Sequence, residues 1–330
     1  MGRKFRWGIV GLGGIAAKFA EGLQVLPDAH LFAVASRTQR KADDFAQRFN
    51  VPHSYGNYAE ILGNKEIDII YIATPHTFHF ENTLMCLEAG IPVLCEKPLA
   101  INSTEVKKMI TKSQEKRVFL TEAMWTAFLP SIKKIKEVIN EGLIGKVELI
   151  RADFGTRADN DPKKRWFNPD LGGGSLLDVG IYPAYLATEI LGRPDKIKAL
   201  ASMVRTGVDE NCGFVFHYKE GQIASLYSSI VVKTATDAMI TGNKGNIYIH
   251  SNFFMPSSVS LIFNDSTRDI TPEYIGNGYN YEAAEAMECL DKGLIQSNSM
   301  NHEKSMLLME ILDEIRKECG IRYPKHDDEE

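Results

Sequence analysis

The chain has 330 residues, of which 44% are hydrophobic and 25% charged, and its formal net charge is −5. This length suits two domains of a globular protein, and the mild negative charge gives no basis for nucleic-acid binding. Short basic runs, at residues 37–41 and 163–165, are typical of a solvated face. No apolar run approaches the roughly 18 residues that a membrane span requires.

The N-terminal stretch and the cysteines bear on location. The N-terminus has a basic start and an apolar stretch interrupted by glycines, which predicts a strand and turn, not a signal peptide. The five cysteines are scattered, with no C-x-x-C pair and no histidine cluster at ligand spacing. This pattern predicts free thiols in a reducing compartment and no metal site, so we expect a cytoplasmic protein.

Up to about residue 121, short apolar runs alternate with helical patterns. Strands are predicted at residues 7–10, 31–35, 67–73, 92–95 and 118–121, with helices between them. Thr38 is placed to cap the second helix, and Gly90 to end the third. This alternation is typical of right-handed βαβ crossovers, so we expect a Rossmann domain with a doubly wound parallel sheet at residues 1–122.

Beyond Trp125 the pattern changes. A helix around residues 132–139 and a strand at 147–154 precede a run of three glycines at 172–174. From residue 196 to about 270, strands are joined by tight turns at 218–222 and 242–246. Two helices, near 281–292 and 303–319, are followed by a tail at 325–330 expected to fray. Residues 123–330 are therefore predicted to form an α+β domain with a large, mostly antiparallel open sheet, for substrate binding and oligomerisation.

A glycine-rich turn follows the first predicted strand. In "WGIVGLGGIAAKF", Gly11, Gly13 and Ala16 form G-x-G-x-x-A between a strand and a helix, and Gly14 and Ile15 open that helix. Gly11 permits the tight turn, Gly13 allows close approach of a pyrophosphate, and Ala16 lets the helix lie on the sheet. An ordinary glycine-rich turn is the alternative, but the strand–turn–helix context favours a dinucleotide site.

The end of the second strand indicates which dinucleotide binds. NAD sites usually carry an acidic residue there to hold the ribose 2′-hydroxyl. Here the strand runs into Ser36 and Arg37, and a hydroxyl and a guanidinium suit a 2′-phosphate. NADP(H) is favoured and NAD(H) remains possible, because Arg37 would tolerate both if it stacked on the adenine.

Two further strand ends carry polar groups at the edge of the sheet where ligands bind. One end has Thr74, Pro75, His76 and His79; the other has Glu96 and Lys97, followed by proline. A lysine in such a turn is either a solvated surface residue or a reactive group facing the cofactor. Position alone leaves these alternatives open.

The order and spacing of G-x-G-x-x-A, A-T-P-x-x-x-H and E-K-P resemble the glucose–fructose oxidoreductase / inositol dehydrogenase / rhizopine catabolism protein (Gfo/Idh/MocA) family. The segments "TEAMWTAFLP" and "GGGSLLDVGIYPAY" are similar to the branch that contains dimeric dihydrodiol dehydrogenase and NADP-dependent xylose dehydrogenases. The resemblance runs from about residue 5 to residue 190. Beyond that, only the strand-rich pattern agrees.

The resemblance implies roles for particular residues. Lys97 would contact the nicotinamide ribose and the reacting substrate oxygen, and the Lys97–Pro98 bond is often cis in relatives. The later motif D-x-G-x-H reads Asp178 to Tyr182 here, so a tyrosine stands where many members have histidine. The dihydrodiol and glucose–fructose branches share that tyrosine. The cofactor site would also include Thr74, Pro75, His76, His79 and Glu96, although His76 and His79 have the alternatives of binding substrate hydroxyls or holding the loop.

A phenol acts as a general base at neutral pH only when its surroundings stabilise its ionised form. Its unperturbed pKa of about 10 makes it a poor base at neutral pH, and a nearby ammonium such as Lys97 favours its ionised form. Asp178 would share a face with Tyr182 if the stretch is helical, and would orient substrate or lysine. Pro183 argues against regular helix unless it lies in a first turn. A helix N-cap is the alternative role for Asp178.

The expected activity is NADP(H)-dependent hydride transfer to or from a secondary alcohol or ketone of a sugar or cyclic vicinal diol. Trp125 and Phe154, with Trp166, would line an apolar pocket beside Asp178 and Tyr182, or else belong to the core. The alternatives are a non-catalytic dinucleotide-sensing regulator and a redox-neutral NAD-dependent glycosidase. The resemblance also implies a homodimer or higher oligomer through the C-terminal sheet, where strands at 213–232 carry apolar residues on both faces.

Overall fold

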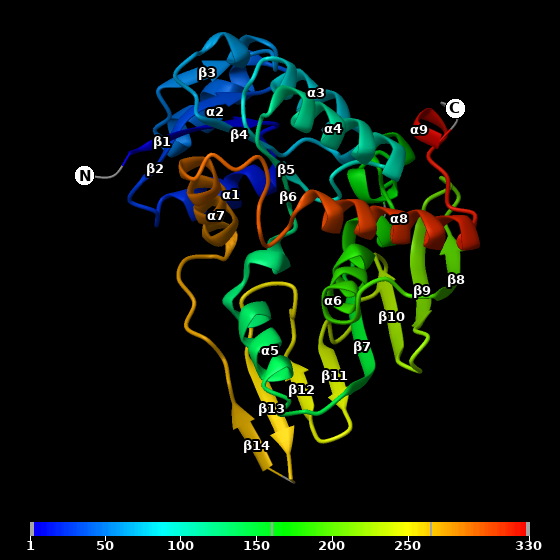
Figure 1. The fold of residues 1–330 in the computed structure, drawn as a ribbon. Coiled ribbons are helices and arrows are strands. Elements are labelled where there is room, and N and C mark those ends of the chain that lie inside the picture. Colours follow the sequence, from blue (N-terminus) through cyan, green and yellow to red (C-terminus); the bar gives the residue numbers. More distant parts are fainter. Residues whose placement is uncertain (1–2, 160, 265, 328–330) are drawn as a thin grey trace. The chain divides into compact units, whose positions relative to one another are not determined.

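The computed structural model describes residues 3–159, 161–264 and 266–327 (Figure 1). Two compact units share the chain. Residues 3–128 and 275–306 form the first unit, and residues 129–274 and 307–327 form the second. The division near residue 306 falls inside helix α8 (His302–Cys319).

The first unit contains a parallel sheet, as predicted, but it has six strands, and the strand at His53–Tyr55 was not among those predicted. The strand order is β3-β2-β1-β4-β5-β6, so the direction of winding reverses between β1 and β4. The strands are β1 (Phe5–Val10), β2 (Ala29–Ala35), β3 (His53–Tyr55), β4 (Ile69–Ile72), β5 (Val93–Glu96) and β6 (Leu120–Ala123). In such a sheet, ligands bind beyond the carboxyl ends of the strands at the reversal point.

The helices of this unit begin and end where local signals place them. They are α1 (Gly14–Leu23), α2 (Gln39–Phe49), α3 (His79–Glu88) and α4 (Ser103–Lys116). Gly90, at φ +75°, follows α3, and the Asn102 side chain accepts a hydrogen bond from the Glu105 amide to cap α4. Thr38 occupies the N-cap of α2 as predicted, but its side chain makes no capping hydrogen bond.

A segment from late in the sequence completes the first unit. Helix α7 (Tyr279–Asp291) packs beside α1 (Figure 1), and a Cβ added to Gly22 would lie 2.9 Å from the Cβ of Tyr279. Further on, the Leu120 amide donates to the Ile295 carbonyl at 3.0 Å. The domain boundary expected between residues 122 and 123 places residues 275–306 in the C-terminal domain, whereas the structure places them in the first unit. Strand and helix periodicity do not indicate that a segment returns to an earlier domain.

The second unit contains the predicted large open sheet, with strand order β14-β13-β12-β11-β7-β10-β9-β8. Among the described pairs, β7 and β10 run parallel and the others antiparallel. The strands are β7 (Val147–Gly155), β8 (Lys196–Met203), β9 (Asp209–His217), β10 (Ile223–Ser229), β11 (Ala238–Gly242), β12 (Asn246–Ile249), β13 (Val259–Phe263) and β14 (Ser266–Asp269).

One face of this sheet is covered by α6 (Ile181–Leu191), which packs against β7 and β10. Helix α5 (Pro130–Asn140) precedes β7 in the chain. Large apolar side chains remain exposed on alternate positions of neighbouring strands: Leu149, Leu200, Val215, Ile223 and Tyr227. The sheet thus has one covered and one open face, as an antiparallel sheet permits.

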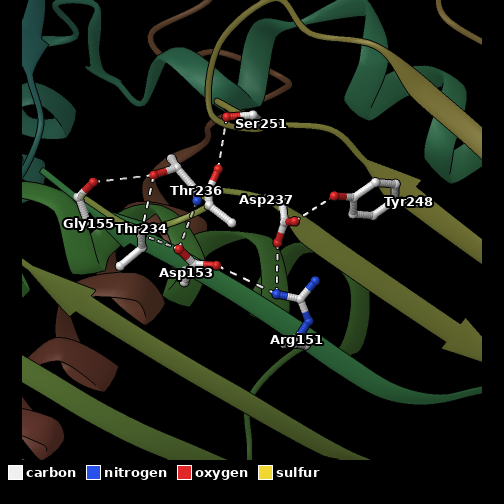
Figure 2. Close-up of polar contacts among 9 residues, drawn as sticks. Arg151, Asp153, Gly155, Thr234, Thr236, Asp237, Tyr248 and Ser251 are labelled. Atoms are coloured by element: carbon white, nitrogen blue, oxygen red, sulfur yellow. Dashed lines mark hydrogen bonds and ion pairs between the residues drawn. The ribbon is translucent and has the colours of Figure 1, made fainter. Parts of the chain in front are cut away.

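A polar network fixes the connection from β10 to β11 (Figure 2). The Asp153 carboxylate accepts a hydrogen bond from the Thr236 amide at 2.9 Å. Arg151 lies 3.6 Å from Asp153 and donates to Asp237 at 2.8 Å, and the Tyr248 hydroxyl donates to Asp237 at 2.6 Å. The charged network lies at β7, β11 and β12, so the apolar part of the open face is centred on β8, β9 and β10.

The C-terminal tail differs from the expectation. Residues 324–327 form a short helix, α9 (Pro324–Asp327). Asp327 accepts hydrogen bonds from Arg316 at 2.5 Å and from the Tyr323 amide at 2.7 Å. The prediction of fraying was wrong for residues 325–327, since this carboxylate ties them to α8, and residues 328–330 lie outside the described residues.

Three global features bear on function. No helix in the described part of the chain is long and apolar enough to cross a membrane. All five cysteines are free thiols, as predicted. Within residues 3–159, 161–264 and 266–327, no group of three or more His, Cys, Asp or Glu side chains is arranged to hold a metal ion.

Candidate active site

The glycine-rich turn between β1 and α1 has the geometry that a pyrophosphate requires. Gly11 has φ +90°, and a Cβ there would lie 2.8 Å from the Thr74 amide nitrogen. A Cβ added to Gly13 or Gly14 would meet no described atom within 4 Å, so the space before the N-terminus of α1 is open. Ala16 is fully buried where α1 meets the sheet. These residues fit a dinucleotide, with α1 supplying backbone N–H groups to its phosphates.

The end of β2 carries no carboxylate. Ser36 is buried, its amide donating to the Tyr55 carbonyl at 3.0 Å, while Arg37 is exposed. Burial raises the pKa of the nearby Tyr58, and the charge of Arg37 acts in the opposite direction. Asp43, one turn into α2, accepts hydrogen bonds from Ser54 at 2.5 Å and Gln39 at 2.8 Å, and its pKa is lowered by them. Arg37 thus lies at a strand end that carries no carboxylate of its own, and Asp43 is engaged by Ser54 and Gln39.

The loop after β4 is tied to the turn after β5 by a histidine. The His79 ring is fully buried, with Nδ1 2.8 Å from the Pro98 carbonyl and Nε2 2.9 Å from the Thr74 carbonyl. The His76 ring lies 5.6 Å from it and is also buried. Of the alternatives for His79, these contacts favour holding the loop over touching a ligand.

The E-K-P turn begins where β5 ends at Glu96, and the Lys97–Pro98 peptide bond is cis. The Tyr71 hydroxyl donates a hydrogen bond to Glu96, whose other oxygen accepts from the Lys97 amide at 3.2 Å. Burial, with the negative charges of Glu96 and Glu282, raises the pKa of Tyr71 well above its usual range, so it acts as a donor. Its ring stacks on Phe19 of α1 at 3.7 Å. Glu96 therefore fixes the backbone that carries Lys97, a side chain only 8% exposed.

Trp125 follows β6 in the turn η3 (Trp125–Phe128) of the first unit. Its ring stacks on that of Tyr279 at 4.3 Å with an interplanar angle of 25°. Tyr279 begins α7, in the returning segment. The sequence pattern singled out Trp125 but gave no signal for this aromatic partner.

Asp178 and Tyr182 lie on either side of a change in helix type in the second unit. Asp178 belongs to a π-helical turn, η6 (Leu176–Gly180), and Tyr182 to the first turn of α6. Pro183 lies two residues after the start of α6, which continues directly from the π turn because Gly180 has helical backbone angles (φ −66°, ψ −23°). Ser175, not Asp178, precedes η6 as N-cap, so the N-cap alternative for Asp178 is wrong. The π turn also breaks the α-helical spacing on which the expected shared face depended.

The glycine run before η6 is anchored from two distant elements. The Tyr323 hydroxyl donates to the Gly173 carbonyl at 2.5 Å. Gly174 has φ +120°, and a Cβ there would lie 2.3 Å from the Asp209 carboxylate. Asp209 accepts hydrogen bonds from Ser175 at 2.6 Å and the Leu176 amide at 2.7 Å, and burial raises its pKa to about 6. These contacts set the start of the π turn that carries Asp178.

Tyr182 lies in an aromatic cluster with Phe154 of β7 and Phe254. The centroid distances are 5.5 Å for Phe154–Tyr182, 5.1 Å for Tyr182–Phe254 and 4.2 Å for Phe154–Phe254. Phe154 and Trp166 also pack against the buried cluster of Phe167, Val179 and Ile230. Phe154 was anticipated, whereas Phe254 lies in a loop whose sequence matches no motif.

Arg165 was also missed by sequence reasoning. Its guanidinium is 2.5 Å from the Asp178 carboxylate and 4.6 Å from the Trp166 ring centroid. The basic run at 163–165 was interpreted as a solvated face, and for Arg165 that interpretation was wrong. A charge pattern along the chain does not reveal a partner thirteen residues away, across the glycine run.

The glycine-rich turn between β1 and α1, in a parallel sheet whose winding reverses between β1 and β4, defines a Rossmann dinucleotide-binding domain. Residues 5–124 match the model of an oxidoreductase family with an NAD-binding Rossmann fold, and residues 132–248 match the GFO/IDH/MocA C-terminal domain. The chain belongs to the GFO/IDH/MocA oxidoreductase family.

Relatives extend over nearly the whole chain. Mouse (Mus musculus) trans-1,2-dihydrobenzene-1,2-diol dehydrogenase is 37% identical, with 97% of this chain and 98% of that protein covered. The human (Homo sapiens) protein of the same name is 33% identical, with the same coverage.

Solved structures share the fold. An aldose–aldose oxidoreductase from Caulobacter crescentus has a TM-score of 0.88 at 23% identity, covering 96% of this chain and 98% of that chain. A 3-ketoreductase from Actinomadura kijaniata in complex with NADP has a TM-score of 0.87 at 23% identity, with the same coverage. A levoglucosan dehydrogenase in complex with NADH has a TM-score of 0.87 at 19% identity, covering 96% and 97%.

Proposed function

We propose that the protein is an NADP(H)-dependent dehydrogenase acting on a secondary alcohol, or the corresponding ketone, of a sugar or cyclic vicinal diol. The observation that carries the proposal is Lys97, held at the carboxyl end of β5 in the same parallel sheet as the phosphate-binding turn. The names of the diol dehydrogenase relatives support the diol class, and those of the fold neighbours support the sugar class.

The chain's own residues would manage the proton and orient the substrate. When bound, the nicotinamide supplies or accepts the hydride, and a proton must leave or reach the substrate oxygen. We assign that proton to Tyr182, and we assign to the Lys97 ammonium the stabilisation of negative charge on the substrate oxygen. The aromatic rings around Tyr182 limit its motion, and Phe154 and Phe254 offer apolar surface to a ring-shaped substrate.

Asp178 would accept a hydrogen bond from a substrate hydroxyl. Its ion pair with Arg165 at 2.5 Å balances the carboxylate charge, and Trp166 restricts the guanidinium. A carboxylate held in this way is an oriented acceptor, which suits the adjacent hydroxyls of a diol or sugar. We therefore propose Asp178 and Tyr182 with Phe154 and Trp125 as substrate-binding residues.

Arg37 should determine the preference for NADP(H). Replacing it with glutamine removes a cation from the end of β2, where the 2′-phosphate would lie. Because hydrogen bonds to charged groups contribute about 1.5–3 kcal/mol, NADPH binding should weaken by roughly 10- to 150-fold. NADH binding should change by less than about 3-fold, since less than a kcal/mol depends on this residue. Isothermal titration with each cofactor measures both values.

Arg40→Gln is the matched control, because Arg40 is an exposed arginine on α2, 93% exposed at its side chain and 4.0 Å from Asp44. It should leave both affinities unchanged. Equal weakening of NADPH and NADH binding by Arg37→Gln would instead mean that the guanidinium stacks on the adenine and does not select the phosphate.

The proposal is tested by a screen of sugars and cyclic diols that follows absorbance of NADPH and then NADH. Robust turnover of a member of either class supports a dehydrogenase. Tight cofactor binding without turnover of any member would favour the dinucleotide-sensing regulator. Cofactor that survives purification, does not exchange and supports glycoside cleavage would favour the redox-neutral glycosidase.

We also propose that the protein is a cytoplasmic homodimer or higher oligomer assembled through the open sheet face of the second unit. Leu200 on β8 is 82% exposed and is the most exposed large apolar side chain on that face. Leu200→Asp should convert the oligomer to monomer in sedimentation velocity, because it buries a charge in the interface. Ile275→Asp, at a 65% exposed apolar residue of the first unit, is the control. An unchanged oligomer in Leu200→Asp would contradict this interface.

A further inference from the structure

Glu122 of β6 is a buried carboxyl group beside the turn that carries Lys97. It pairs in register with Cys95 of β5 and is 2% exposed. Its Oε1 accepts a hydrogen bond at 3.0 Å from the amide of Leu99, two residues beyond Lys97. Ser305, from α8, lowers the pKa of this carboxyl group, while Glu122 Oε2 is buried and accepts no hydrogen bond from the described residues. Glu122 therefore holds the outgoing side of the turn.

The whole Lys97 turn is held by buried polar side chains. Glu96 receives the Tyr71 hydroxyl and the Lys97 amide on the incoming side, and His79 contacts the Pro98 carbonyl at 2.8 Å. Glu122 holds Leu99 after the turn. The Lys97 amide, the Pro98 carbonyl and the Leu99 amide are thus fixed by side chains from β5, α3 and β6 respectively.

The charges that face Glu122 come from several elements. From the end of β5 they are the Lys97 ammonium and the Glu96 carboxylate, and the Cys95 thiol lies opposite in register. From α8, His302 contacts the Leu120 carbonyl at 3.0 Å, and burial lowers its pKa, which favours the neutral ring. From α7, Glu282 interacts with Glu96, and burial together with the Glu96 charge raises the pKa of Glu282 well above its usual range. Among these described charges, Lys97 is the positive one that lowers the pKa of Glu122.

We propose that Glu122 is a positioning residue for Lys97: its ionised carboxylate fixes the far side of the turn and attracts the ammonium, whereas its protonated form leaves Lys97 displaced from its working position. This inference rests on the proposed function only in its catalytic readout. The Glu122 carboxyl group accepts a hydrogen bond from the Leu99 amide and also interacts with the charge of Lys97. One side chain thus acts both on the backbone of the turn and on the lysine.

The proposal predicts a pH dependence near neutrality. Burial raises the pKa of Glu122 to about 7, while Ser305, the hydrogen bond from the Leu99 amide and the charge of Lys97 lower it. The ionised form, present above that pH, is the one that draws Lys97 into place. Activity should therefore fall as pH decreases through about 7. Removing the Ser305 hydroxyl should move this inflection to higher pH, because a polar group that lowers the pKa of Glu122 is lost.

The test compares Glu122→Gln and Ser305→Ala with the unaltered full-length protein. The glutamine side chain keeps an acceptor for the Leu99 amide but has no ionisable group. The acid-side inflection in kcat/KM should disappear in Glu122→Gln, leaving activity at the low plateau, and should shift upward in Ser305→Ala. NADPH affinity, measured by titration, should change by less than about 3-fold, which corresponds to less than a kcal/mol. Infrared titration of the protonated-carboxyl band, assigned by its loss in Glu122→Gln, gives the same shift without substrate.

An acid-side inflection that persists unchanged in Glu122→Gln would overturn the proposal, as would an infrared band that does not move in Ser305→Ala. Because the infrared titration needs no turnover, its result separates this proposal from the proposed function. A shifted band with no dehydrogenase activity on any diol or sugar would leave the titration of Glu122 supported and would count against the dehydrogenase alone.

Discussion

Lys97→Met should reduce turnover by about 10²- to 10⁴-fold while NADPH still binds with near-normal affinity. Methionine has a similar length and apolar stem but no ammonium, so it removes the charge expected to stabilise the substrate oxygen. The turn itself should persist, because Glu96, His79 and Glu122 hold it through backbone groups at and after Lys97. Steady-state kinetics and a cofactor titration on the same preparation measure the two effects.

Lys65→Met provides the control, because Lys65 is an exposed lysine of the same unit that donates only to the Leu62 carbonyl among the hydrogen bonds described. It should retain normal turnover. Near-normal turnover in Lys97→Met would remove Lys97 from the chemistry, and the solvated-turn interpretation of this lysine would then be correct.

Tyr182→Phe should also lower turnover by about 10²- to 10⁴-fold, because it removes the group assigned to proton transfer. The ring would still pack between Phe154 and Phe254, at centroid distances of 5.5 Å and 5.1 Å, so the fold and KM should change little. The pH profile of kcat/KM should lose the limb that belongs to the phenol. Kinetics over a pH series, with circular dichroism as a check on folding, measure these outcomes.

Tyr218→Phe is the matched control in the same unit. Tyr218 is 5% exposed and its hydroxyl donates to the Gly192 carbonyl at 3.4 Å, so the variant removes a buried phenol hydroxyl from the second unit. It should keep its turnover and its pH profile. An equal loss in both variants would point to general destabilisation and count against proton transfer by Tyr182.

The parallel sheet was predictable because its strands are buried on both faces and therefore read as continuous apolar runs. Ile69–Ile72 is buried at every position, and the residues around it predict a strand without any partner being known. The glycine-rich turn was equally predictable, since the backbone at position 11 has φ +90°, which favours glycine. The assignment of residues 275–306 to the first unit was not predictable from the sequence. The periodicity of helix α7 would be the same if it packed in the second unit.

The candidate site was predictable where a motif concentrates several residues in one short segment. Lys97 and Tyr182 were singled out in this way, and the resemblance to a known family supplied the roles proposed for them. Arg165, Phe254 and Tyr279 were not found, because each meets its partner through tertiary packing and not through spacing along the chain. The π-helical turn at 176–180 was also missed, since its i to i+5 bonding has no clear sequence signature.

Hydride transfer itself is the central claim, and deuterium labelling tests it most directly. The protein would be incubated with NADPH deuterated at the transferring C4 position and with the ketone of the best substrate from the screen. We predict that mass spectrometry will find one deuterium on the carbinol carbon of the product, and none with Lys97→Met over the same time. Product without deuterium at that carbon, formed at the normal rate, would contradict the account.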